Sequence, residues 1–136
     1  MNNRARYRYL YYVLYKWNLE RFGKADFPQL NGLLLLSLFS FTNFVTVLLL
    51  FDVVLRVDLF QLAFPNSFAA GGIAMLNLLV NYFFIYANGK NTKIVEYFNN
   101  LSKVEVNKFR KFSYLYFISS ILIMFLVVLV WCYKGL

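Results

Sequence analysis

Three long stretches without a charged residue constrain this chain more than any other feature of its sequence. They run from Leu33 to Phe51, from Phe68 to Ala87 and from Phe112 to Trp131. A helix needs about 20 predominantly apolar residues to cross the roughly 30 Å hydrocarbon core of a bilayer. Membrane-barrel strands need only about 9–11 residues and alternate in polarity, which these stretches do not. We therefore expect three transmembrane helices, at about 30–54, 67–87 and 112–133.

The composition agrees with a membrane protein. Hydrophobic residues make up 61% of the 136 residues and charged residues 15%, against roughly 45–50% and about 25% in ordinary globular domains. A small soluble domain buries only about 60–70% of the surface that its unfolded chain exposes, so it would leave much apolar surface in water. The expected fold class is an all-α integral membrane protein, in which residues 1–136 form a single transmembrane domain.

Turn and capping residues predict where the helices end. Pro28 follows an acidic residue and suits the first turn of the first span. Asn66 offers an N-cap for the second span, and Asn88-Gly89 marks its end or a kink. Gly23 is a plausible stop for a helix near the N-terminus. The apolar stretch after Asp52 predicts that the first helix extends beyond the bilayer.

The basic residues are distributed unevenly among the connecting segments. Six precede the first stretch and six lie between the second and third, whereas the other two segments have one each, Arg56 and Lys134. Short cytoplasmic segments carry an excess of Lys and Arg. We therefore expect a multi-pass protein of a bacterial-type inner membrane, with its N-terminus in the cytoplasm and its C-terminus outside. The net charge of +8 then faces anionic lipid headgroups on the cytoplasmic side.

Residues 1–27 form a basic and aromatic segment, in which we expect an amphipathic interfacial helix at about 5–22. Its polar face repeats every four residues and includes Tyr12 and Glu20, and its opposite face is apolar. Tyrosine and tryptophan rings favour the headgroup level. Interleaved Arg and Tyr also suit single-stranded nucleic acid, but interfacial anchoring is the preferred interpretation. The expected anchor residues are Arg4, Arg8, Leu10, Leu14, Lys16 and Trp17.

Residues 88–111 form the second basic segment expected in the cytoplasm. Apolar residues recur in it at a helical spacing, which predicts an amphipathic helix leading into the third span. Those residues are Ile94, Val95, Phe98, Leu101 and Val104.

The polar residues within the apolar stretches are uncharged, and we expect them to bind neighbouring helices. In the first span they recur every third residue, and in the second they share one arc with small residues whose spacing permits close packing. From their depth we predict that Asn43 meets Asn77, and that Asn81 meets a serine of the first or third span. The candidate packing residues are Ser37, Ser40, Asn43, Thr46, Ala70, Ala74, Asn77, Asn81, Ser119 and Ser120.

No catalytic or metal-binding pattern is evident. The chain has no histidine, and Cys132 is its one cysteine. No two of its six acidic residues form a close pair within a span, and we expect a simple ion pair between Asp52 and Arg56. We therefore expect a protein that is not an enzyme and that needs no metal or cofactor.

The sequence favours an interaction protein. In this hypothesis the chain is a helix-packing subunit or accessory factor of a membrane complex, formed with copies of itself or with a larger partner. A second hypothesis is an oligomeric pore or membrane-permeabilising protein, holin-like or a phage-defence effector, with Asn43, Asn77 or Asn81 facing water. A membrane tether that uses its basic face to bind nucleic acid is a third and weaker alternative.

Overall fold

A computed structural model describes residues 2–135, and the chain is all-helical over these residues. Three helical segments are long and apolar enough to cross a membrane, as expected. Two of them are the single helices α2 and α6, and the third begins with α4. The main helices are α1 (Asn3–Phe22), α2 (Pro28–Leu55), α3 (Leu59–Ala63), α4 (Ser67–Asn81), α5 (Lys90–Asn99) and α6 (Lys103–Gly135).

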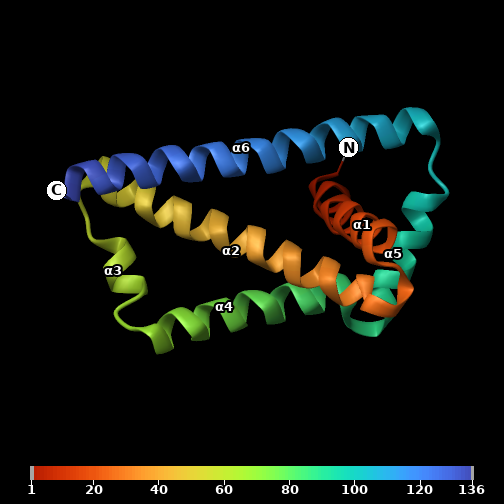
Figure 1. Cartoon of the computed structure of the whole chain (residues 1–136), viewed down its shortest axis with the longest axis horizontal. Coiled ribbons are helices and arrows are strands. Elements are labelled where there is room, and N and C mark those ends of the chain that lie inside the picture. The colour runs from red at the N-terminus through yellow and green to blue at the C-terminus, as the bar shows by residue number, and fades with distance from the viewer. Residues whose placement is uncertain (1, 136) are drawn as a thin grey trace.

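The three long helices run along the longest axis of the molecule, with α2 between α4 and α6 (Figure 1). At one end α1 crosses them and packs against α2, α5 and α6. At the other end α3 joins α2 to α4, and the C-terminus lies there too. The bundle is therefore closed at the end where α1 and α5 lie, whereas α2 and α4 diverge toward the opposite end.

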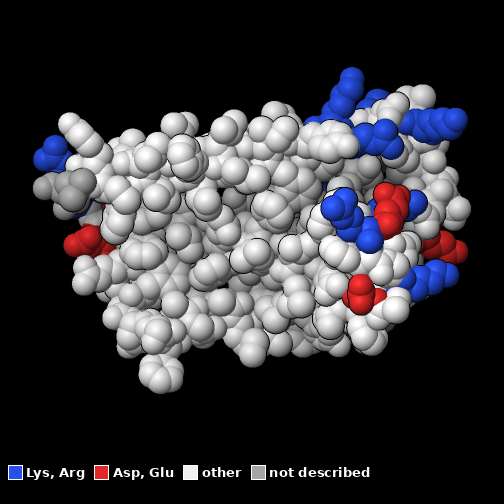
Figure 2. All heavy atoms as spheres, viewed as in Figure 1, with Lys and Arg blue, Asp and Glu red and all other residues white. Residues whose placement is uncertain are grey.

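Charged residues gather at the two ends of the molecule. Figure 2 shows most Lys and Arg side chains over the α1 and α5 end, a few charged groups at the opposite end, and a broad uncharged band between them. The band is formed by α2, α4 and α6, whose exposed side chains are mostly large and apolar. This division of the surface agrees with the pattern that the sequence predicts for a membrane protein.

The two ends of α2 are fixed by Pro28 at its start and by a turn at Arg56 after its last residue. Pro28 occupies the first turn, as predicted, and Phe27 before it takes a left-handed conformation. At the other end α2 stops at Leu55, close to the predicted bound at about residue 54, and Arg56 turns the chain back. The Asp52 carboxylate accepts the backbone N–H of Leu59 at 2.6 Å, so it caps the short helix α3. An acidic cap at a helix N-terminus explains Asp52 without the expected ion pair to Arg56.

The ends of the second span follow the predicted signals. The Asn66 side chain accepts the backbone N–H of Ala69 at 2.9 Å and caps α4. After α4 the helix widens into one π-helical turn, Tyr82–Tyr86, and a 3₁₀ turn, Ala87–Gly89, follows. Asn88 and Gly89 both have positive φ there, which stops the helix and redirects the chain into α5.

The segment after Gly89 is not the single amphipathic helix that was predicted. It divides into α5 and the first turns of α6, with a break at Asn100–Ser102. At the break the Ser102 hydroxyl accepts the backbone N–H of Glu105, and the Glu105 carboxylate accepts the backbone N–H of Ser102. This reciprocal capping box starts α6 nine residues before the apolar stretch at Phe112.

Candidate functional site

Asn81 is the centre of a polar network that joins α1, α2 and α4. Its side chain is 3% exposed. The amide oxygen accepts a hydrogen bond from the Tyr7 hydroxyl of α1, and the amide nitrogen donates to the Ser40 hydroxyl of α2 at 3.1 Å. The predicted contact between Asn81 and a serine of the first span is therefore confirmed. The hydroxyl of Tyr7 was not expected to reach this depth.

Asn77 extends the network by one helical turn. Its amide nitrogen donates to the backbone carbonyl of Ser37 at 2.7 Å, and its amide oxygen accepts from the Ser40 hydroxyl at 2.9 Å. The Ser37 hydroxyl is itself buried without a partner among the described residues. The α2–α4 contact is thus held by the Asn77 amide, whose nitrogen and oxygen both find partners on α2 of the same chain.

The predicted contact between Asn43 and Asn77 is wrong. The Asn43 amide donates to the Tyr116 hydroxyl of α6 at 2.6 Å, whereas Asn77 lies against Ser37 and Ser40. A step of three residues turns back by about 60° around a helix, so Ser37 and Asn43 point about 120° apart. The polar row along α2 therefore winds from the α4 side to the α6 side, and equal depth does not bring the two asparagines together.

Two of the remaining polar candidates bond to their own helices. Thr46 donates to the carbonyl of Thr42 at 2.8 Å, and Ser119 donates to the carbonyl of Tyr116 at 3.1 Å. The hydroxyls of Thr46 and Ser119 are compatible with an apolar environment because a helix carbonyl accepts their protons. Ser120 is buried.

The small residues of α4 divide into two groups. Ala70 and Ala74 are half-buried. Gly71 and Gly72 are exposed, and a Cβ placed on either of them would meet nothing within 4 Å. No helix among the described residues therefore approaches α4 closely at Gly71 or Gly72.

The N-terminal helix is more central than an interfacial anchor. Leu10 and Leu14 are buried, as predicted, but Trp17 is 51% exposed. Of the expected basic face, Arg4 is exposed while Arg8 and Lys16 are half-buried. Tyr12 was assigned to that polar face, which is wrong. It is buried, and its hydroxyl donates to the Asn99 side chain at 2.8 Å.

Aromatic rings join α1 to the neighbouring helices. Tyr9 lies 5.1 Å from both Phe98 and Phe109 between ring centroids, so one ring joins α1 to α5 and to α6. Tyr11 is fully buried against α2. Burial raises the pKa of the Tyr11 hydroxyl above its ordinary value of 10.0, and the neighbouring tyrosines Tyr86 and Tyr15 raise it further. Tyr9, Tyr11 and Tyr12 thus belong to a buried core, and Tyr7 and Tyr15 pack against it.

Two residues that fix this arrangement were missed from the sequence. A Cβ on Gly32 would lie 3.1 Å from the backbone nitrogen of Tyr15, so α1 crosses α2 closely at a position where a larger side chain would push the two helices apart. A lone glycine in a leucine-rich stretch was the available signal. The second residue is Ser102, for which Ser102-x-x-Glu105, the signature of a capping box, was the available signal.

The chemistry of the described residues is that of packing and hydrogen bonding. Within residues 2–135 no three side chains of the metal-ligating types His, Cys, Asp and Glu come together. The polar groups of the network are amides and hydroxyls. Comparisons with protein-family models, curated proteins and solved structures found no match for this chain. A functional proposal therefore rests on the geometry described above.

Proposed function

We propose that the chain is a non-enzymatic, multi-pass protein of a bacterial-type inner membrane that acts as a helix-packing subunit or accessory factor of a membrane complex. Its partner is a second copy of the chain or a larger protein. The observation that carries the proposal is the open face of α4, where a Cβ placed on Gly71 or Gly72 would meet no atom within 4 Å among residues 2–135. Helices associate in membranes through such small residues, which let two backbones approach closely.

Exposed glycines in a helix are costly unless they serve a contact. Glycine is about 1 kcal/mol less favourable than alanine in a helix interior. Gly32 offsets that cost by admitting α1, but Gly71 and Gly72 have no such contact within the protomer. Beside them Phe68 is 90% exposed. A partner helix seated on this part of α4 would use both the glycines and the exposed ring.

The alternative is an oligomeric pore or membrane-permeabilising protein. It needs the amides of Asn43, Asn77 or Asn81 to face water between copies. Within the protomer these amides donate to Tyr116, to Ser37 and to Ser40, respectively. Few of their hydrogen-bonding groups therefore remain to line a water-filled pore. Satisfied inward-facing amides support the packing proposal over the pore.

The proposal is tested by adding bulk to the open face of α4. Gly71→Leu should dissociate the complex that the wild-type chain forms in mildly solubilised native membranes, measured by blue-native electrophoresis and by photobleaching steps of a fluorescent fusion. Gly71→Ala is the matched control, because it keeps the surface small and should retain the complex. Expression of the wild-type chain should leave the membrane potential unchanged.

Two results would overturn the proposal. The first is a wild-type chain that migrates and bleaches as a monomer in its native membrane. The second is rapid depolarisation on expression that Asn77→Leu abolishes, which would favour the pore instead.

A further inference from the structure

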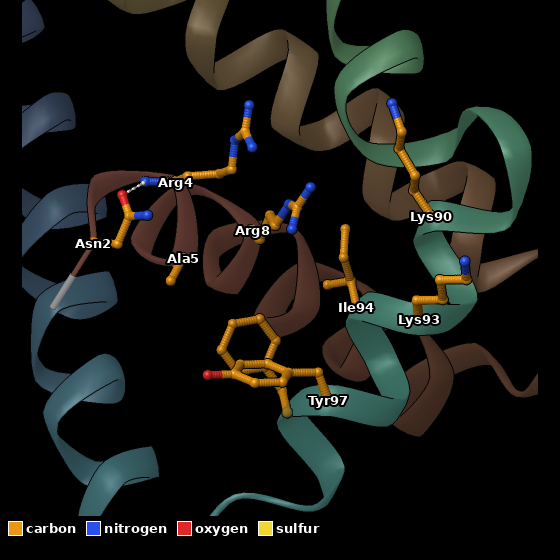
Figure 3. A pocket seen from close by; sticks show the side chains of 9 residues that line it. Asn2, Arg4, Ala5, Arg8, Lys90, Lys93, Ile94 and Tyr97 are labelled. Atoms are coloured by element: carbon orange, nitrogen blue, oxygen red, sulfur yellow. Dashed lines mark hydrogen bonds between the residues drawn. The ribbon is translucent and has the colours of Figure 1, made fainter.

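A basic cavity lies between the start of α1 and α5. Its volume is about 470 Å³, which is within the usual range of about 300–1,000 Å³ for small-molecule sites. Arg4 and Arg8 line it from α1, and Lys90 and Lys93 line it from α5. Figure 3 shows Arg4 and Arg8 on one side and Lys90 and Lys93 on the other, with Ile94 and Tyr97 beside them, and the Lys90 ammonium donates to the backbone carbonyl of Phe83 at 2.7 Å.

The cavity concentrates positive charge without an acidic partner. No Asp or Glu is among the residues that line it. Four like charges around one space repel each other, and an anion placed among them would relieve that repulsion. Orientation signals in a membrane protein require only that basic residues lie on one side, so they do not explain why these four converge on a cavity.

The two arginines of the cavity suit a phosphate ligand, because a guanidinium group pairs with phosphate through two parallel hydrogen bonds. Arg8 is half-buried. Its Nε atom is buried without a hydrogen-bond partner among the described residues, but so is the Nε atom of Arg6, which does not line the cavity. The ligand is therefore inferred from the four clustered cations and not from this atom.

An apolar hollow adjoins the basic cavity. It is lined by Arg4, Tyr7, Val80, Asn81 and Phe84, and Arg4 borders both spaces. The Arg4 guanidinium lies 5.8 Å from the centre of the Phe84 ring. Val80 and Phe84 are exposed on the apolar surface of the second span. A headgroup bound among the cations would therefore have an apolar path along α4 for its acyl chain.

We propose that this cavity binds the phosphate group of an anionic phospholipid, with Arg4, Arg8, Lys90 and Lys93 around the phosphate and one acyl chain against Val80 and Phe84. Basic pockets between helices on the cytoplasmic side of membrane proteins recognise anionic headgroups in this way. A free phosphate group offers the same charge but not the acyl chain, and the apolar hollow favours the lipid. The site does not depend on whether the chain assembles with a partner.

The test uses the purified full-length chain in a neutral detergent. Phosphatidylglycerol is titrated against phosphatidylcholine of the same acyl chains and against inorganic phosphate. Native mass spectrometry counts the retained lipid, and the thermal unfolding midpoint gives an apparent affinity. Phosphatidylglycerol should be retained at one molecule per chain and raise the midpoint. Phosphatidylcholine and inorganic phosphate at the same concentration should do neither.

Two pairs of variants separate the cavity from general surface charge. Arg4→Gln with Arg8→Gln should weaken the apparent affinity for phosphatidylglycerol about 30-fold, given the usual contribution of each of the two basic residues. Lys90→Gln with Lys93→Gln changes the opposite wall and should act in the same direction, even if one pair alters folding. The matched control is Lys108→Gln with Lys111→Gln, two exposed residues of α6. It removes the same charge and should change the affinity less than about twofold.

Three outcomes would overturn the proposal. Equal loss of affinity in the control pair would reduce the effect to surface charge. Equal retention of phosphatidylcholine would remove the role of the cations. Protection by inorganic phosphate alone, at the concentration where the lipid acts, would assign the cavity to a soluble phosphate compound.

Discussion

Single hydrogen-bonding groups hold the centre of this protein together, and Asn81 is the most connected of them. Asn81→Leu should lower the free energy of unfolding by about 1–2 kcal/mol, because it leaves the partly buried Tyr7 hydroxyl without its acceptor. Intramembrane hydrogen bonds average about 0.6 kcal/mol, so the excess over that value would come from the orphaned hydroxyl. The measurement is equilibrium unfolding in mixed detergent micelles.

A double-mutant cycle gives this prediction its control. Tyr7→Phe with Asn81→Leu should cost less than the sum of the two single changes, since the pair is coupled. Ser119→Ala should have almost no effect, because the Ser119 hydroxyl bonds only to a carbonyl of its own helix. Strict additivity of Tyr7→Phe and Asn81→Leu would show that the two side chains do not interact.

Tyr11 makes the stability of the protein sensitive to alkaline pH. Burial raises the pKa of its hydroxyl in the folded chain, so the unfolded chain loses the proton first. The contribution is complete below the ordinary pKa of 10.0 and is lost as pH rises from there toward the folded value. The slope for one group is at most about 1.4 kcal/mol per pH unit.

Tyr11→Phe should therefore flatten the alkaline loss of stability relative to the wild-type chain. Tyr97→Phe removes an exposed phenol and serves as the control. Thermal unfolding followed by circular dichroism between pH 7 and about 11 measures both. Identical alkaline profiles for the wild-type and Tyr11→Phe chains would contradict the assignment.

At the scale of the element, the position of α1 depends on one glycine of α2. A Cβ on Gly32 would lie 3.1 Å from the Tyr15 backbone nitrogen and 3.3 Å from the Tyr11 ring. Gly32→Leu should displace α1 and cost about 1–3 kcal/mol, the usual range for overpacking. Gly72→Leu adds the same bulk where there is open space and should leave the protomer stable.

The readout is limited proteolysis of the chain in detergent. Gly32→Leu should expose the link between α1 and α2, residues 23–27, to cleavage, because α1 no longer anchors it. Gly72→Leu should be cut no faster than the wild-type chain. Equal protection of the Gly32→Leu chain would mean that α1 and α2 can separate slightly without loss of packing.

At the scale of the whole molecule, charge predicts the orientation in the membrane. The α1 and α5 end is basic, and the C-terminus lies at the other end (Figures 1 and 2). We expect the N-terminus and residues 88–111 inside, and residues 56–66 and the C-terminus outside. Cys132 is exposed and is the chain's one cysteine, so a membrane-impermeant thiol reagent should label the wild-type chain in intact cells.

The complementary variant combines Cys132→Ser with Asn107→Cys, at an exposed position near the start of α6. It should be labelled only after the cells are lysed. Labelling of the Asn107→Cys chain but not of the wild-type chain in intact cells would reverse the orientation.

The sequence by itself determined the class of fold and most helix ends. Stretches of about 20 uncharged residues allow few structures other than long helices. Local signals act through the adjacent backbone, so Pro28, Asn66 and Gly89 were readable without tertiary information. A contact between Asn81 and a serine was also predictable, because its two groups lie at matching depth in neighbouring helices.

The tertiary structure alone decided which faces meet. Asn43 and Asn77 match in depth, but the turn of α2 directs them to different neighbours. Tyrosine is chemically suited to a headgroup layer and to a buried core with a hydroxyl partner, and the sequence does not distinguish the two. Only the fold brings Asn99, Phe98 and Phe109 against α1, where they bury the tyrosine rings of that helix. The convergence of basic side chains from α1 and α5 on one cavity follows from the same placement, because these helices are distant in sequence and adjacent only in space.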